Sequence, residues 1–150
     1  MGDFSKEINS EFPNERVKAL LNIKYTSNFL DTVGNAYLKP FNISEQQYNI
    51  LRILRGAKEA ITVNKVKERM VQKSPNSTRL MDKLCDKGFI ERVRCENDRR
   101  VVYVKINDRG LALLNEIKMD EFNSYLNSIS ENEAKILNEI LDKLRDFSLS

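Results

Sequence analysis

The chain has 150 residues, of which 41% are apolar and 31% are charged, and its formal net charge is +3. This composition is typical of a globular domain with a buried core, and no apolar run approaches the roughly 18 residues that a membrane-spanning helix needs. The polar N-terminus lacks the basic and apolar regions of a secretory signal. We therefore expect a cytoplasmic protein with no membrane partner.

The residue types that most enzymes and metal sites depend on are scarce. The sequence contains no histidine and two cysteines, Cys85 and Cys95. Two thiols without a histidine cannot complete a structural zinc site within one chain. Histidine, the commonest general base, is therefore missing. The phosphate-binding motifs Gly-x-x-x-x-Gly-Lys and Gly-x-Gly-x-x-Gly do not occur either. We predict a protein that is not an enzyme and that uses no metal or cofactor.

Charge is distributed unevenly along the chain. Residues 62–105 contain 12 basic and 6 acidic side chains, whereas residues 106–150 contain 5 basic and 9 acidic ones. Residues 1–61 are nearly balanced, with 8 basic and 7 acidic side chains. The basic middle segment is either an ordinary solvated surface or the electrostatic footprint of a protein that binds a polyanion.

The first elements in chain order are two amphipathic helices. Helical spacing of apolar residues predicts a long helix over residues 13–38, which the Lys39-Pro40 step should end because proline disfavours helical geometry at the residue before it. A Ser-x-x-Gln capping box that begins at Ser44 predicts a second helix, and Gly56 is expected to end it.

Two shorter helices follow. Thr62 is a predicted N-cap for a helix over residues 63–72. Ser74 is the predicted N-cap of the next helix, with Pro75 at the first helical position, which proline favours. Gly88 fits the left-handed position just past the end of that helix.

The hydrophobic period then changes from helical to alternating. Residues 91–95 and 101–106 predict an antiparallel hairpin with one covered face. The connecting residues 96–100 include good turn formers and place Arg99 and Arg100 at the tip.

Two further helices complete the chain. Asn107 is the predicted N-cap of a helix whose apolar residues extend from Leu111 to Ile129. A Ser-x-x-Glu capping box at Ser130 predicts the last helix, over residues 131–147.

This order predicts a mainly α fold with a small β-hairpin wing, in a single domain over residues 1–150. Residues 44–106 have the dimensions of a winged helix-turn-helix lobe. The amphipathic helices at 13–39 and 108–147 present more apolar surface than that lobe can cover. We expect them to intertwine with a second copy as a dimerisation region, and the alternative is a monomeric helical bundle.

The second helix of a helix-turn-helix motif lies in the major groove of DNA, and a wing tip suits the adjacent minor groove. Asparagine can pair with adenine and arginine with guanine. The candidate DNA-binding residues are Pro75, Asn76, Ser77, Thr78, Arg79, Lys83, Arg99 and Arg100. Each of them alone is equally explained by solvent exposure, but the group on one helix face favours contact. Asp98 is expected to hold one wing arginine by a charge-assisted hydrogen bond, so that the tip stays ordered.

The wing and the following helix resemble the MarR family of winged-helix bacterial transcriptional regulators. That family carries an Asp-x-Arg-x-x-x-Val-x-Leu-Thr-x-x-Gly signature. The residues in register with it are Asp98, Arg100, Val104 and Gly110, with Ile106 and Asn107 at its Leu and Thr positions. The resemblance spans residues 13–147 and implies a homodimer that binds a palindromic operator in double-stranded DNA. Such a protein is usually a repressor, and a small effector or an oxidant releases it.

The resemblance also implies a small aromatic or lipophilic effector that binds between the dimer helices and the DNA-binding lobe. Tyr25, Phe29, Tyr48 and Tyr103 could line such a cleft, but aromatic residues at these spacings are more often part of a core, so the effector-binding residues are not assigned.

Two other functions stay open from the sequence. A winged helix can serve as a protein-interaction adaptor, although adaptors tend to lose the basic recognition helix and wing tip. Oxidant sensing through Cys85 or Cys95 is the other alternative. The peroxide-sensing branch of the family uses a cysteine near the start of the first helix, and this chain has none before Cys85. Inert thiols are the favoured interpretation.

Overall fold

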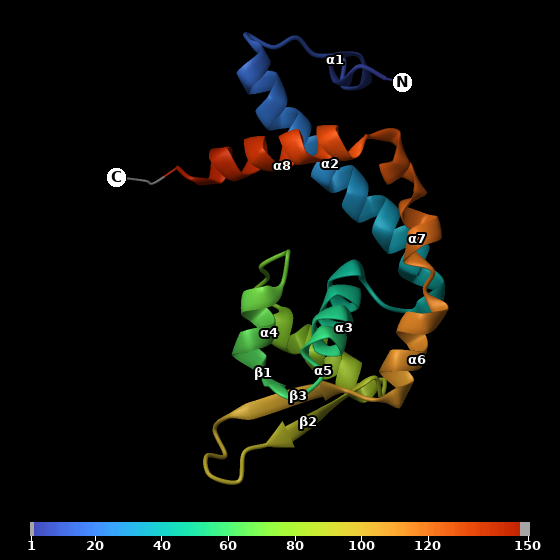
Figure 1. The fold of residues 1–150 in the computed structure, drawn as a ribbon, viewed down its shortest axis with the longest axis vertical. Helices are drawn as coiled ribbons and strands as arrows, with labels where there is room; N and C mark the ends of the chain where they lie inside the picture. The colour runs from blue at the N-terminus through green and yellow to red at the C-terminus, as the bar shows by residue number, and fades with distance from the viewer. Residues whose placement is uncertain (1, 148–150) are drawn as a thin grey trace. The chain divides into compact units, whose positions relative to one another are not determined.

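The structure of this chain is a computed structural model that describes residues 2–147 (Figure 1). The chain divides after Ile117 into two compact units. The first unit contains most of the helices and a small antiparallel sheet, and the second contains the C-terminal helices. The predicted mainly α fold with a β wing is confirmed. Within residues 2–147, no helix is long and apolar enough to cross a membrane.

The long helix predicted near the N-terminus is α2 (Glu15–Leu38). A short helix that was not predicted, α1 (Phe4–Glu7), precedes it. The Phe4 ring stacks on Phe12 with 5.3 Å between the ring centroids, and its centroid lies 5.2 Å from that of Tyr25. This aromatic cluster attaches the N-terminal segment to α2.

The helix α2 ends at Leu38, before the Lys39-Pro40 step, as predicted, but the proline does not force Lys39 out of helical geometry. Lys39 keeps helical angles (φ −53°, ψ −43°), and the chain continues through the 3-10 helix η1 (Lys39–Phe41). Pro40 is accommodated because the first positions of a helix need no N–H donor. The left-handed Asn42 (φ 58°) ends the path instead.

The second helix, α3 (Glu45–Ala57), begins as predicted. The Ser44 hydroxyl accepts from the Gln47 amide and the Gln47 side chain accepts from the Ser44 amide, so both halves of the capping box are present. The prediction that Gly56 ends this helix is wrong, because Gly56 lies inside it and Lys58 takes the left-handed position (φ 61°).

The third helix, α4 (Val63–Arg69), has Thr62 as its N-cap, as predicted, but ends earlier than expected. Met70 is extended and buried, and the Val71 amide donates to Asn49 Oδ1 of α3 at 3.1 Å. This hydrogen bond to α3 takes the place of the last helical turn that the sequence predicted for α4.

The fourth helix is α5 (Ser77–Asp86), and the prediction of Ser74 as its N-cap is wrong. Ser74 Oγ instead accepts from the Asn76 amide at 3.1 Å, which closes a local turn around Pro75. The helix therefore starts two residues later than predicted. Gly88 has φ 79°, as expected for the residue after a helix.

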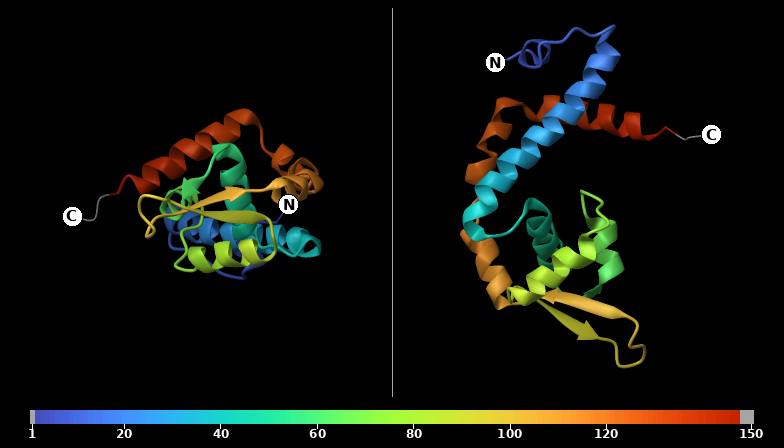
Figure 2. Two further views of the ribbon diagram at one scale, coloured as in Figure 1. Left: turned by 90° about the horizontal axis from the view of Figure 1, so that it is seen from below. Right: turned by 180° about the vertical axis from the view of Figure 1, so that it is seen from behind.

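The sheet has three strands rather than the predicted two, in the order β1 (Ile61–Thr62), β3 (Val102–Ile106), β2 (Ile90–Arg94). Both pairings are antiparallel, with Ile61 and Arg92 both opposite Val104. The predicted hairpin of β2 and β3 is confirmed, and its tip projects beyond the helices of the first unit (Figures 1 and 2).

Asn107 caps the next helix, α6 (Asp108–Glu116), as predicted. Its Oδ1 accepts from the Gly110 amide at 2.9 Å, and its Nδ2 donates to the Gly88 carbonyl at 2.7 Å. The prediction that this helix continues to Ile129 is wrong, because Ile117 becomes extended (φ −81°, ψ 106°) and buries its side chain in the first unit.

The second unit consists of α7 (Met119–Phe122), the 3-10 helix η2 (Asn123–Ser128) and α8 (Glu131–Arg145). Asparagine and serine are frequent in η2, and both have low helix propensity, which accounts for the interruption. The capping box of Ser130 and Glu133 at the start of α8 is present, as predicted.

The core of the first unit surrounds α3. Its largest fully buried side chains are Leu38, Ile50, Leu51, Leu54, Val66, Met81, Leu84 and Val104. They come from α3 itself and from four elements that pack around it, and this packing fixes the position of α5 beside the sheet.

Candidate nucleic-acid interface

The two faces of α5 differ sharply in exposure. Ser77, Met81 and Leu84 follow helical spacing and are buried, which anchors one face on the core. The opposite face leaves Thr78, Arg79 and Lys83 exposed. A helix with one buried stripe and one basic, hydroxyl-bearing face can present polar groups to the major groove.

Ser77 corrects the sequence-based assignment. The sequence predicts that Ser77 contacts DNA, but only 1% of this residue is exposed, and its hydroxyl donates to the Ser74 carbonyl at 2.8 Å. Its side chain is part of the turn that precedes α5. Pro75 and Asn76 in that turn are exposed, and the Asn76 side chain makes no capping hydrogen bond to the helix.

The wing tip is organised by Asp98. Its Oδ1 accepts from the Arg100 amide at 3.0 Å and from Arg100 Nε at 3.1 Å. These hydrogen bonds to Arg100 hold the pKa of the Asp98 carboxyl below its usual value of 3.8. The Arg100 side chain is nevertheless 91% exposed, and Arg99 is exposed beside it. Both arginines are accessible at the tip.

The structure adds two arginines that the sequence analysis did not assign. Arg92 and Arg94 of β2 line a groove of about 540 Å³ between α5 and the wing, and Arg92 forms an ion pair with Asp82 of α5. The strand alternation carries a signal for them, because it places both arginines on the same face as the buried Ile90.

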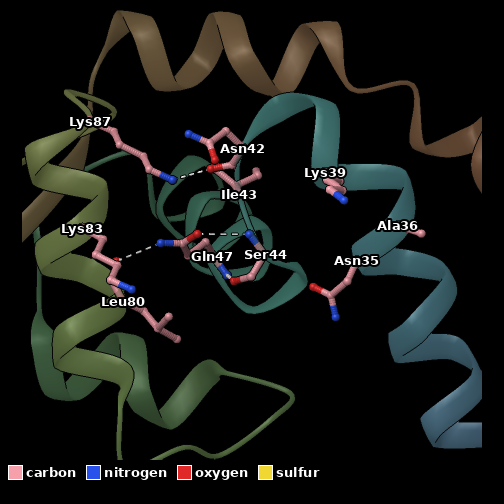
Figure 3. Close-up of a pocket in the computed structure, with 10 residues that line it drawn as sticks. All are labelled: Asn35, Ala36, Lys39, Asn42, Ile43, Ser44, Gln47, Leu80, Lys83 and Lys87. Carbon is pink, nitrogen blue, oxygen red and sulfur yellow. Dashed lines mark hydrogen bonds between the residues drawn. The ribbon is translucent and has the colours of Figure 1, made fainter.

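A second concavity, of about 500 Å³, lies where the end of α2 and the start of α3 approach α5 (Figure 3). Its basic lining residues are Lys39, Lys83 and Lys87. Lys87 Nζ donates to the Asn42 carbonyl. The buried Gln47 lies at its base, where its Oε1 accepts from the Ser44 amide at 3.0 Å.

Neither cysteine is in a disulfide. Burial raises the pKa of the Cys85 thiol, and the nearby Asp86 charge raises it further. A raised pKa disfavours the reactive thiolate. Among residues 2–147, no group of three metal-ligating side chains is placed to hold an ion.

Comparisons with known proteins agree with this arrangement. The model of the MarR family matches residues 43–102, which contain α5 and the wing tip. The HTH-type transcriptional regulator SarZ of Staphylococcus aureus is 32% identical over 114 residues, which cover 74% of this chain and 73% of SarZ. The HTH-type transcriptional regulator PecS of Dickeya dadantii is 24% identical over 152 residues, which cover 96% of this chain and 92% of PecS.

A solved structure of a MarR protein also matches this chain. A mutant MarR from E. coli in complex with operator DNA has a TM-score of 0.68 and 28% sequence identity. The match covers 95% of this chain and 99% of that one.

Proposed function

Because this chain belongs to the MarR family of transcriptional regulators, we propose that it acts as a homodimer on a palindromic operator and represses transcription until a small effector releases it. It is a regulator that binds DNA and not an enzyme. Residues 44–106 act as the DNA-binding lobe of a single MarR-like domain over residues 1–150, and residues 13–39 and 108–147 supply the dimerisation helices. Its place of action is the cytoplasm, where chromosomal DNA is accessible.

The observation that carries sequence-specific binding is the exposed polar face of α5 next to an ordered wing. In this proposal Thr78, Arg79 and Lys83 contact the major groove, together with the exposed turn before the helix. Arg99 or Arg100 contacts the minor groove. The hydrogen bonds from Arg100 to Asp98 support a wing-ordering role for that carboxylate.

Exposed apolar side chains support the homodimer. The large apolar residues exposed on α2 are Leu20, Leu21, Ile23, Tyr25, Phe29 and Leu30, and those on α8 are Ile136, Leu137, Ile140 and Leu144. No residue of α8 is buried within the chain. An isolated helix of this length is marginal in water, so its apolar stripe needs a partner surface.

The lysine-lined concavity of Figure 3 supports an anionic effector. The side chains of Ile43 and Leu80 give it an apolar part, and its lysines suit a carboxylate. An aromatic acid has both features. None of the four aromatic residues considered from the sequence lines this concavity.

The test is selection of bound sequences from a random duplex pool at about 0.15 M salt, which suppresses weak phosphate attraction. A palindromic motif with half-sites about 10 base pairs apart is expected from a two-fold dimer. No enrichment by folded protein would contradict sequence-specific binding.

The assigned contacts are tested on the selected operator. Arg79→Ala and Arg99→Ala should each weaken operator binding by about 1 to 3 kcal/mol. The control is Arg55→Ala. Arg55 is an exposed arginine of α3 that lines neither the groove between α5 and the wing nor the concavity of Figure 3. Unchanged affinity in the first two variants would show that the contacts are wrongly assigned.

A further inference from the structure

The groove between α5 and the wing contains more positive charge than the proposed base contacts use. We propose that it is a binding site for the DNA backbone, in which Arg94 contacts a phosphate and the ion pair of Asp82 with Arg92 positions α5 against the wing. The inference rests on the proposed function, because it assumes that α5 and the wing tip engage one duplex.

The groove is formed by three parts of the first unit. The start of α4 and its N-cap supply residues 62–64, α5 supplies Thr78, Met81 and Asp82, and the hairpin supplies the rest. The hairpin residues that line it are Arg92, Arg94, Arg100, Val101, Val102 and Val104. Its floor is apolar, and three guanidinium groups lie along its hairpin side.

The strand register explains why these arginines face α5. Arg92 lies opposite Val104 and Arg94 lies opposite Val102. Alternate residues of a strand share a face, so both arginines extend the face that begins with the buried Ile90. That face is apolar where α5 covers it and becomes basic toward the tip.

The two arginines have different partners. Arg92 pairs with Asp82, and both side chains are about half exposed. This pairing neutralises a carboxylate that would otherwise repel a phosphate, and it links the recognition helix to the wing. The Arg94 side chain makes no hydrogen bond or ion pair within residues 2–147. Its guanidinium has five donors in a fork that matches a phosphate.

The geometry of DNA selects the backbone as the occupant. The major and minor grooves of a duplex are separated by one phosphodiester strand. If α5 occupies the major groove and the wing tip occupies the adjacent minor groove, that strand must pass between them. The space between α5 and the wing is the groove that Arg92 and Arg94 line.

The test measures operator affinity against salt concentration for Arg94→Gln. Loss of one phosphate contact should lower the slope of log K against log salt by about 0.9 for each protomer on the duplex. Affinity should fall about tenfold, equally for operator and random duplexes. Arg94→Lys retains the charge and should keep most of the slope.

Lys105→Gln is the matched control. It removes the same charge from the same hairpin, but Lys105 pairs with Glu91 on the opposite face of the sheet at 3.7 Å. Its salt slope should equal that of the wild type. Equal slopes for Arg94→Gln and Lys105→Gln, while the wild type binds its operator, would overturn this inference and leave the proposed function intact.

The positioning role of the ion pair between Asp82 and Arg92 is tested separately. Arg92→Gln should lose more affinity than Arg94→Gln, because it leaves the Asp82 carboxylate facing the backbone. The double variant Arg92→Gln with Asp82→Asn should recover part of the loss. No recovery would contradict the neutralising role of Arg92. If inorganic phosphate stabilises the wild type but not Arg94→Gln, and duplex binding is unchanged in Arg94→Gln, the groove holds a small anion and the inference fails.

Discussion

Glu45 occupies an unusual place for a carboxylate, at the point where α3 approaches α2. Its Oε2 is buried and has no hydrogen-bond partner among the described residues, and a Cβ added at Gly34 would lie 2.8 Å from this oxygen. Burial, and then the charge of Asp31, raise the pKa of Glu45 above its usual 4.5. Because the folded-state pKa is the higher one, ionisation of Glu45 disfavours folding. Its cost is absent below about pH 4.5 and develops as the pH rises through the folded-state pKa.

Glu45→Gln should therefore stabilise the protein at pH 7, by less than about 1 kcal/mol because solvent screens a partly exposed carboxylate, and have little effect at pH 4. Denaturant unfolding at both pH values measures the difference. The control is Glu59→Gln, in the exposed loop after α3, which should change stability little at either pH. An equal gain at both pH values would exclude ionisation of Glu45 as the cause.

Helix ends show how local chemistry and packing compete at the scale of elements. Both predicted capping boxes are present, because a hydroxyl and a carboxylate or amide three residues apart satisfy each other's backbone amides without help from the rest of the chain. The end of α3 was predicted at Gly56, but Lys58 occupies the left-handed position instead. A glycine allows a helix to end but does not force it to.

Gly56 lies in an ordinary helical conformation with open space around its missing Cβ. Gly56→Ala should raise stability by about 1 kcal/mol, because alanine favours the helix and restricts the unfolded chain. Thermal unfolding measures it. Gly88→Ala is the comparison variant. Because Gly88 has φ 79°, where a side chain is strained, this substitution should lower the stability of the protein. A loss of stability in Gly56→Ala would show that the end of α3 needs glycine.

Gly110, in the first turn of α6, is required by close packing rather than by backbone angles. A Cβ there would lie 2.4 Å from the Phe89 carbonyl oxygen, which belongs to the backbone and cannot move aside cheaply. The glycine of the family signature therefore lets α6 begin directly against the residue that precedes β2.

At the scale of the whole molecule, the apolar stripe of α8 decides between a monomer and a dimer. Leu137→Lys places a charge in the proposed interface and should weaken dimerisation by on the order of 3 kcal/mol. Sedimentation equilibrium measures the change. Lys143→Gln, a change to an exposed polar residue of the same helix, should leave the assembly unchanged. If wild type and Leu137→Lys are both monomeric, the homodimer is wrong.

The amino-acid sequence by itself determined the order of the main elements, both capping boxes, the hairpin and the basic face of α5. These features depend on neighbours three or four residues apart or on strand alternation, and such interactions need no tertiary contact. The resemblance to the family depends on local patterns of the same kind over residues 13–147, among them the signature from Asp98 to Gly110.

Only the tertiary structure decided the features that depend on distant contacts. α4 ends early because the Val71 amide bonds to Asn49, and α6 stops because Ile117 enters the core. Burial removes Ser77 from the candidate interface, and the ion pair of Asp82 with Arg92 joins β2 to α5. Buried area and pairing across elements exist only after the chain has folded, so sequence spacing alone did not reveal them.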